Sequence, residues 1–198
     1  MSETRNALLE ATRTCIGRKG LAATTSRDIA AGAEANLQAI TYHFGSKDRL
    51  VAEALLDGMR SWLAPTIGVL AGDGDPAART LAAIQSLLAT FEEHRADAAT
   101  YLQALAHASV ADPLRAGIVE LWGELRVLLA GDMRAMQASG ELGAWVDPEA
   151  MSAVLVAVAN GFVVQATVDP GGPPLPALAA QFAGLMLAAR QPRTATGS

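Results

Sequence analysis

The chain has 198 residues, of which 51% are hydrophobic and 18% charged. This is enough apolar material for one folded domain or two small ones, and too much for a disordered chain. The formal net charge of −5 does not by itself favour nucleic acid as a partner. Alanine is abundant and aromatic residues make up only 5%, so we expect helices rather than strands.

Compartment signals are few. The longest unbroken apolar run covers the seven residues 153–159, whereas a membrane helix needs about 20 residues, so we expect no membrane partner. Glu3 and Glu10 interrupt any apolar leader. Cys15 is the single cysteine, which excludes an internal disulfide and a cysteine-based metal cluster. We therefore expect a cytoplasmic protein without metal or cofactor.

Charge is distributed unevenly along the chain. Residues 1–50 hold seven Lys or Arg and five Asp or Glu, whereas residues 51–198 hold eight and fifteen. A basic first quarter on an acidic remainder suggests a small basic module attached to a larger acidic body.

The first quarter carries signals for three helices. The first, 3–19, should end at Gly20 and bury an apolar face that includes Cys15. The second should start at Thr25, where Thr-Ser-Arg-Asp matches a capping box. The third, 37–44, should be capped by Asn36 and end at Gly45, with Ile40 and Phe44 in the core.

Six further helices are expected. The fourth begins after Ser46, and Pro65 should kink or end it. Three Asp-Pro pairs mark later helix starts, because Asp favours the N-cap and Pro the first turn. The later helices are expected at about 76–95, 97–110, 113–138, 148–168 and 175–190, followed by a disordered tail, 192–198. The prediction is an all-α chain of about nine helices.

The two short helices within residues 25–44, joined by a tight turn, have the layout of a helix-turn-helix. The stretch from Ile29 to Lys47, ending in Tyr-His-Phe-Gly-Ser-Lys, resembles the DNA-binding signature of TetR-family transcriptional regulators. The resemblance covers about residues 5–55. It implies a DNA-binding domain over 1–48 and a ligand-binding and dimerisation domain over 49–191.

The resemblance also implies DNA-contacting positions. The N-terminal turn of the third helix should enter the major groove, where Gln38 can pair with an adenine edge. Arg27 matches a position that reaches a base or a phosphate. Glu34 stands where the family usually has glycine, so strain is expected there if its φ is positive. The expected groove residues are Asn36, Leu37, Gln38 and Ala39, and the expected phosphate contacts are Thr25, Ser26, Thr41, Tyr42, His43 and Lys47.

The segments 148–168 and 175–190 are apolar on most sides. They are either two ordinary core helices or a subunit interface that forms a four-helix bundle with a second copy. We favour the interface, because one recognition helix reads few bases and a two-fold dimer matches two half-sites. The residues expected there are Leu155, Val158, Phe162, Phe182, Leu185 and Met186.

The helices between about 50 and 138 should enclose a pocket, and the resemblance implies a small-molecule inducer in it. Aromatic and methionine side chains suit an apolar ligand, and His107 and Arg126 could orient a polar group. The candidates are Trp62, Phe91, Tyr101, Gln103, His107, Trp122, Arg126, Met133 and Met136.

We thus expect a homodimeric repressor that a small, largely apolar ligand releases from a palindromic DNA operator. Activation of transcription is an alternative, since the same motif serves both. An all-α enzyme finds no support, because no nucleophile–base pair, phosphate-binding loop, dinucleotide motif or metal spacing is present. A helical protein-interaction module without DNA binding is the third possibility, and the net negative charge is its best support.

Overall fold

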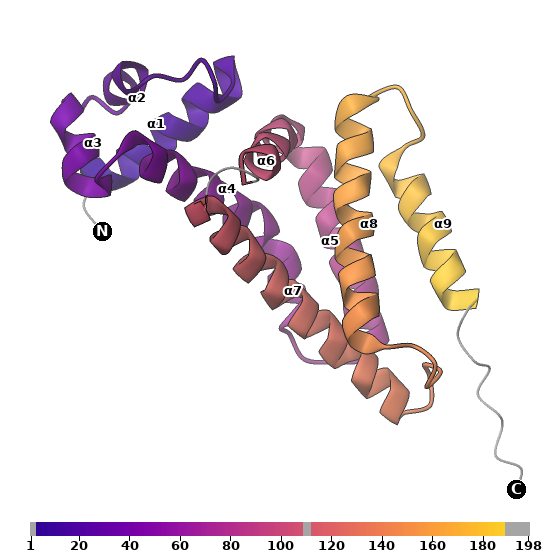
Figure 1. The fold of residues 1–198 in the computed structure, drawn as a ribbon. Coiled ribbons are helices and arrows are strands. Elements are labelled where there is room, and N and C mark those ends of the chain that lie inside the picture. Colours follow the sequence, from indigo (N-terminus) through magenta and orange to yellow (C-terminus); the bar gives the residue numbers. More distant parts are fainter. Residues whose placement is uncertain (1–2, 109–111, 189–198) are drawn as a thin grey trace, which may run out of the picture. The chain divides into compact units, whose positions relative to one another are not determined.

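The computed structural model describes residues 3–108 and 112–188, apart from the side chains of residues 96, 112 and 186–188. Within these ranges the chain forms nine helices and no strand (Figure 1), so the predicted all-α class is confirmed. The helices are α1 Glu3–Lys19, α2 Ser26–Gly32, α3 Leu37–Phe44, α4 Lys47–Leu70, α5 Pro76–Glu93, α6 Arg95–Ala108, α7 Asp112–Ala138, α8 Pro148–Val168 and α9 Leu175–Ala188.

Most helix limits lie within two residues of those expected, because the caps that predict them are formed. Pro65 was expected to kink or end α4, and it does not end the helix, which continues to Leu70. A proline in a helix leaves the carbonyl four residues earlier without its donor. Here Ser61 and Pro65 are both exposed, so water can satisfy that carbonyl and the helix persists.

The chain divides into two compact units. Residues 1–62 and 94–121 form one, called here the N-terminal unit, and residues 63–93 and 122–198 form the other, the C-terminal unit. These units are defined by packing. The expected boundary after residue 48 separates a DNA-binding domain from a ligand-binding domain, and this division of function stays a prediction. The expected disordered tail, 192–198, lies outside the described residues.

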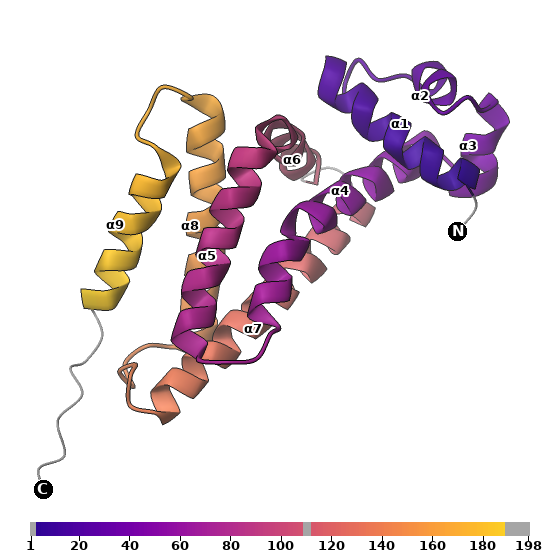
Figure 2. The same cartoon turned by 180° about the vertical axis from the view of Figure 1, so that it is seen from behind.

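The N-terminal unit has its core where α1, α2 and α3 pack around one another (Figure 2). Ile40 and Phe44 of α3 are each 3% exposed, as their four-residue spacing predicts. Cys15 was expected to be buried on the apolar face of α1, but it is only half-buried. The core cluster consists of Leu8, Leu9, Ala11, Ile29, Ala30, Ile40, Phe44, Leu50 and Ala54.

Two other helices are joined to this three-helix core. Ion pairs link Arg5 and Arg13 of α1 to Glu53 and Asp57 of α4. Helix α6 also packs against α1, and the Gln103 side-chain oxygen accepts a hydrogen bond of 2.8 Å from the Leu21 amide. The loop after α1 is therefore held by a side chain more than 80 residues away.

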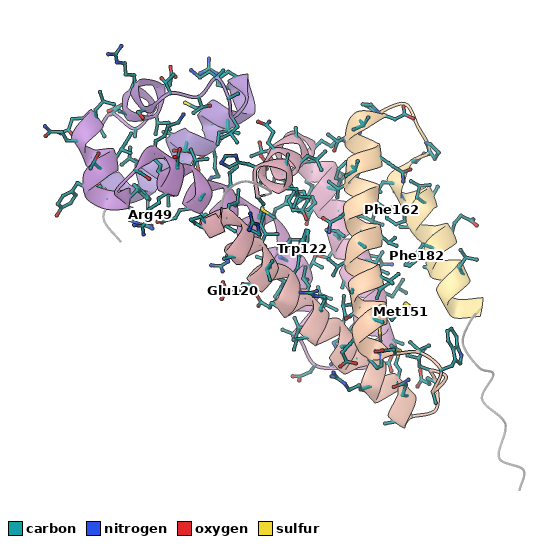
Figure 3. All side chains as sticks on the ribbon, in the orientation of Figure 1. Arg49, Glu120, Trp122, Met151, Phe162 and Phe182 are labelled. Atoms are coloured by element: carbon teal, nitrogen blue, oxygen red, sulfur yellow. The ribbon has the colours of Figure 1, made fainter. Side chains whose placement is uncertain are left out.

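In the C-terminal unit, α9 packs against α5 and α8. Helices α8 and α9 run antiparallel, with Phe162 and Phe182 between them and their rings edge to face, 6.3 Å apart (Figure 3). Asp132 of α7 is 2% exposed and forms an ion pair with Arg79 of α5. This carboxylate holds the pKa of Arg79 above its ordinary value through a charge-assisted hydrogen bond.

Helix α8 is strongly apolar but little covered by its own chain. An 18-residue window within it has a mean hydropathy of 1.8, yet only 11% of that window is buried. By length and composition alone it would be able to cross a membrane, although the longest apolar run had predicted no span. Asn160, Gln165 and Thr167 break its apolar surface, which fits a helix that packs on another helix better than one surrounded by lipid.

Candidate nucleic-acid interface and ligand-binding region

The start of α2 is held by the predicted capping box. The Thr25 hydroxyl accepts from the Asp28 amide at 3.2 Å, and the Asp28 carboxylate accepts from the Thr25 amide at 2.9 Å. Lys19 lies 2.5 Å from the same carboxylate. The hydrogen bond from Lys19, followed by those from Thr25, lowers the pKa of Asp28 well below its ordinary value. The first turn of α2 is thus fixed, and its helix dipole end suits a phosphate.

The turn between α2 and α3 contains the one non-glycine residue of the described chain with positive φ. That residue is Glu34, with φ at 50°, so the strain expected at this position is present. The turn is closed by a hydrogen bond of 2.9 Å from the Ala35 amide to the Ala30 carbonyl. The bond stabilises a backbone conformation that glycine would adopt at lower cost.

Helix α3 buries one face and exposes the other. The Asn36 side chain caps it by accepting a hydrogen bond of 2.9 Å from the Ala39 amide, and Ala39 packs partly buried against the core. On the outer face Leu37 is 48% and Tyr42 84% exposed, and Gln38 and Thr41 are exposed as well. Large side chains held outward on a capped helix can reach base edges and backbone phosphates.

The remaining predicted DNA contacts differ in solvent exposure and in whether their side chains already bind another part of the chain. Ser26 is half-buried, whereas Arg27 is exposed. The His43 ring is half-buried and lies edge-on to Tyr42, with centroids 4.8 Å apart. Lys47 is half-buried, and its Nζ donates to the Thr24 carbonyl. Lys47 therefore joins the start of α4 to the approach of α2, a structural role that the sequence did not reveal.

Sequence reasoning missed Arg49. It stands in the first turn of α4, is exposed, and has no ion pair among the residues that the structure describes. Figure 3 labels it at the start of α4. The signal available was a second cation two residues after the matched Lys47, at a helix start. Arg49 is thus a further candidate for a phosphate contact.

The predicted ligand residues fall in both units. Trp62, Tyr101, Gln103 and His107 belong to the N-terminal unit, where the Trp62 and Tyr101 rings lie 5.2 Å apart. The side-chain oxygen of Gln103 already accepts a hydrogen bond from the Leu21 amide. In the C-terminal unit, Phe91 is 2% exposed, and Arg126 Nε donates to the Trp122 carbonyl at 3.2 Å. The ligand role of these residues stays a prediction.

The C-terminal unit contains a cavity of about 350 Å³ between α5, α7, α8 and α9. Met133 and Met136 are the two predicted ligand residues that line it. Some of the other lining residues lie at the start of α5, inside the range 50–138 that was expected to enclose a pocket. The rest lie in the α7–α8 loop and on α8 and α9, segments in which the sequence indicated no pocket.

The predicted interface residues Leu155, Val158, Phe162 and Phe182 are half-buried within the chain itself, and Leu185 is 70% exposed. The side chain of Met186 lies outside the described part. The most exposed apolar residues of α8 were missed, and they are Val154, Val164 and Val168, at 47%, 41% and 75%. With Ala157 and Gly161 they recur every three or four residues, a helical stripe that could have been found in the sequence.

Comparison with known proteins agrees with this architecture. Residues 8–54 match the model of the bacterial regulatory proteins of the tetR family, and residues 76–190 match the model of the BetI-type transcriptional repressor C-terminal domain. No curated protein matches the chain significantly.

Solved structures share the fold. A proposed transcriptional regulator from Saccharomonospora viridis in complex with choline has a TM-score of 0.82 at 21% identity, over 98% of this chain and all of that one. A TetR transcription regulator from Haloarcula marismortui has a TM-score of 0.82 at 21% identity, over 96% and 100%. A proposed regulator from Pseudomonas aeruginosa has a TM-score of 0.75 at 24% identity, over 93% and 91%.

A helix-turn-helix with an outward recognition helix, followed by an all-helical C-terminal region, defines a DNA-binding transcriptional regulator. The chain belongs to the tetR family of bacterial regulatory proteins.

Proposed function

We propose that this protein is a homodimeric, ligand-responsive repressor in the cytoplasm that binds a palindromic operator. The observation that carries the proposal is the division of α3 into two faces. Ile40 and Phe44 anchor the helix in the core, while Gln38 and Tyr42 stand outward. In this reading Gln38 reads a base edge, and Tyr42 and Arg49 contact phosphates.

The proposed dimer is supported by α8 and α9. Their exposed apolar side chains form a surface that a monomer would leave in water. A second copy would bury this surface about a two-fold axis, and two recognition helices would then meet successive half-sites. No enzymatic role is proposed, because the chain belongs to a regulator family.

The proposed ligand acts by shifting a population. A small molecule that prefers a dimer with a different separation of recognition helices withdraws protein from the DNA-bound state. The coupling is reciprocal, so operator DNA must weaken ligand binding by the same factor. Binding of choline by the S. viridis relative supports a small organic ligand. Activation of transcription is the alternative, and the structure favours neither sign.

The test is selection of binding sites from random-sequence duplex DNA at moderate salt. A recovered palindrome whose binding is lost in Tyr42→Ala would establish a dimeric, sequence-specific regulator. Binding should fall steeply with salt, because each neutralised phosphate releases counterions. Recovery of no sequence, with no salt-dependent binding to any duplex, would overturn the proposal in favour of a protein-interaction module.

A further inference from the structure

We propose that the groove between α1 and α2 is a contact surface for the same groove of a second copy, so that the N-terminal units of neighbouring dimers meet on adjacent operators. The inference goes beyond the proposed function, which concerns one dimer on one operator, and its DNA experiment rests on that function. The groove has a volume of about 800 Å³ and lies entirely within the N-terminal unit.

Two contacts show how α1 and α2 lie along the groove (Figure 2). Lys19, the last residue of α1, forms an ion pair of 2.5 Å with Asp28 in the first turn of α2. Gly32, the last residue of α2, approaches the middle of α1, since a Cβ on it would lie 3.3 Å from the Ala11 Cβ. The end of α1 and the end of α2 are therefore at opposite ends of the groove.

Most of the charged residues that line the groove are already paired. Lys19 and Asp28 neutralise each other, and Glu10 pairs with Arg13 of the same helix. These pairs lie within one chain, so they leave little charge for a partner to recognise.

Two lining residues are exceptions. Arg18 and Glu34 are exposed, and neither has an ion pair among the residues that the structure describes. Arg18 precedes Lys19 at the end of α1, about 10 Å along the helix from Ala11. Glu34 follows Gly32 by two residues, at the end of α2. One free cation and one free anion thus stand at opposite ends of the groove.

This charge pattern is complementary to itself. When two copies of the groove face each other about a two-fold axis, Arg18 of each copy meets Glu34 of the other, which is the reciprocal pairing of an isologous contact. An unrelated partner would need the opposite pattern at the same spacing, whereas a second copy necessarily carries it. The free charges therefore favour a second copy as the occupant.

Adjacent palindromic operators supply the required axis. Each bound dimer is two-fold symmetric, so the point midway between two such dimers is a local two-fold axis that relates the facing N-terminal units. Glu34 lies two residues before Asn36, the cap of the recognition helix, so the contact forms close to that helix. Exposed ion pairs are weak, and they matter where DNA holds two copies at a high effective concentration. The expected result is cooperative binding.

The first experiment measures binding of the full-length protein to duplexes with one or two selected operators, spaced in single base-pair steps over one helical turn. Two exposed ion pairs predict that the second dimer binds roughly two- to tenfold more tightly than the first at the best spacing, and that salt reduces this advantage. Arg18→Glu and Glu34→Arg should each abolish it, because like charges then face each other. The double variant should restore it, because opposite charges face each other again.

Glu124→Arg is the matched control. Glu124 is exposed on α7 and does not line the groove, and its substitution changes the net charge as Glu34→Arg does. This variant should keep the cooperative advantage. Every affinity is compared with that for the one-operator duplex, so a direct effect of Arg18 or Glu34 on DNA contact does not enter the ratio.

The second experiment uses Cys15 as a reporter, because it is the single cysteine and lines the groove. A second copy seated on the groove should slow alkylation of Cys15 by N-ethylmaleimide. Bound protein should react more slowly on the two-operator duplex than on the one-operator duplex. Without DNA, the rate should fall in concentrated protein at low salt, in the wild type and the double variant but not in Arg18→Glu.

Three outcomes would overturn the inference. A cooperative advantage that persists in Arg18→Glu would assign it to the DNA. Loss of one-operator binding in Arg18→Glu, with an unchanged ratio, would make Arg18 a DNA contact. Alkylation rates equal in all proteins, at every concentration and on both duplexes, would leave the groove to another protein or a small molecule. Failure of the wild type to bind any one-operator duplex would count against the proposed function, and alkylation without DNA would still decide whether the grooves meet.

Discussion

Two regions of the molecule differ in how far they bury their apolar side chains. One is the three-helix core of α1, α2 and α3, and the other is the helix pair α8 and α9. In the three-helix core each helix buries its apolar residues against its neighbours, and Leu8 and Ile29 are fully covered, as is Leu50 of α4, which packs into the same core. In α8 and α9 the apolar content is higher, yet Val168 and Leu185 remain 75% and 70% exposed. The first region is complete as a single chain, whereas the second has an apolar surface that its own chain leaves open.

The comparison shows that apolar content alone does not locate a core. Polar residues in the helix-turn-helix cap helices or face outward. The residues of α3 that stabilise the fold therefore lie on one face of the helix, and those proposed to contact DNA lie on the other. In α8 and α9 the same residues would serve both stability and assembly. Substitutions should therefore separate DNA binding from folding in the first region, and change assembly in the second.

The largest effect is expected from Val164→Arg on α8. A charge without a partner in an interface costs about 3–5 kcal/mol, so the protein should sediment as a monomer and lose at least 100-fold in operator affinity. Val127→Arg on α7, at a valine 70% exposed, is the control and should remain dimeric. A Val164→Arg protein that sediments as a dimer would show that α8 is not the interface.

Lys47 and Arg49 offer a comparison within one helical turn. Lys47→Met removes the hydrogen bond to the Thr24 carbonyl and should lower the free energy of unfolding by about 1 kcal/mol. Arg49→Met should leave the melting temperature unchanged, but reduce the slope of log affinity against log salt by about 1. Thermal unfolding and salt titrations measure the two. An unchanged salt slope in Arg49→Met would remove Arg49 from the interface.

Glu34 tests whether strain or charge matters in the turn. Glu34→Gly removes the strain of positive φ, about 1–2 kcal/mol, but adds about 0.5–1 kcal/mol of backbone entropy, so stability should rise by about 1 kcal/mol or less. Glu34→Ala removes the charge and keeps the strain. Both variants should bind DNA a few-fold more tightly in fluorescence anisotropy if the carboxylate repels a phosphate. If neither gains affinity, that repulsion is absent.

The smallest effect is a pH dependence at Asp28. Its pKa is lowered by Lys19 and Thr25 in the folded protein, so it stabilises the fold above the ordinary aspartate pKa of about 3.9 and loses this contribution as pH falls toward the folded pKa. Asp28→Asn should thus melt below the wild type at pH 7, and the difference should shrink by pH 3. Asp48→Asn, at the first turn of α4, is the control. A gap in melting temperature that is constant with pH would refute the assignment.

Much of the DNA-binding region was predictable because its signals are local. Thr25 and Asn36 cap α2 and α3 within three residues of themselves, just as Asp147 caps α8 in the C-terminal unit. Glycines end α1 and α3 where the sequence places them. The spacing of Ile40 and Phe44 shows which face of α3 is inward. None of these inferences needs a residue from a distant part of the chain.

Long-range contacts decided the rest. The sequence could not show that Gln103 holds the Leu21 amide or that Lys47 holds the Thr24 carbonyl, because both bonds join segments more than 20 residues apart. Nor could it show that the ligand candidates fall in two units, or that a cavity lies between α5, α7, α8 and α9. The sequence by itself determined the helices, their caps and the family, since these depend on neighbours along the chain. Only the tertiary structure decided which polar groups are free and which apolar residues are covered, since both depend on which helices meet.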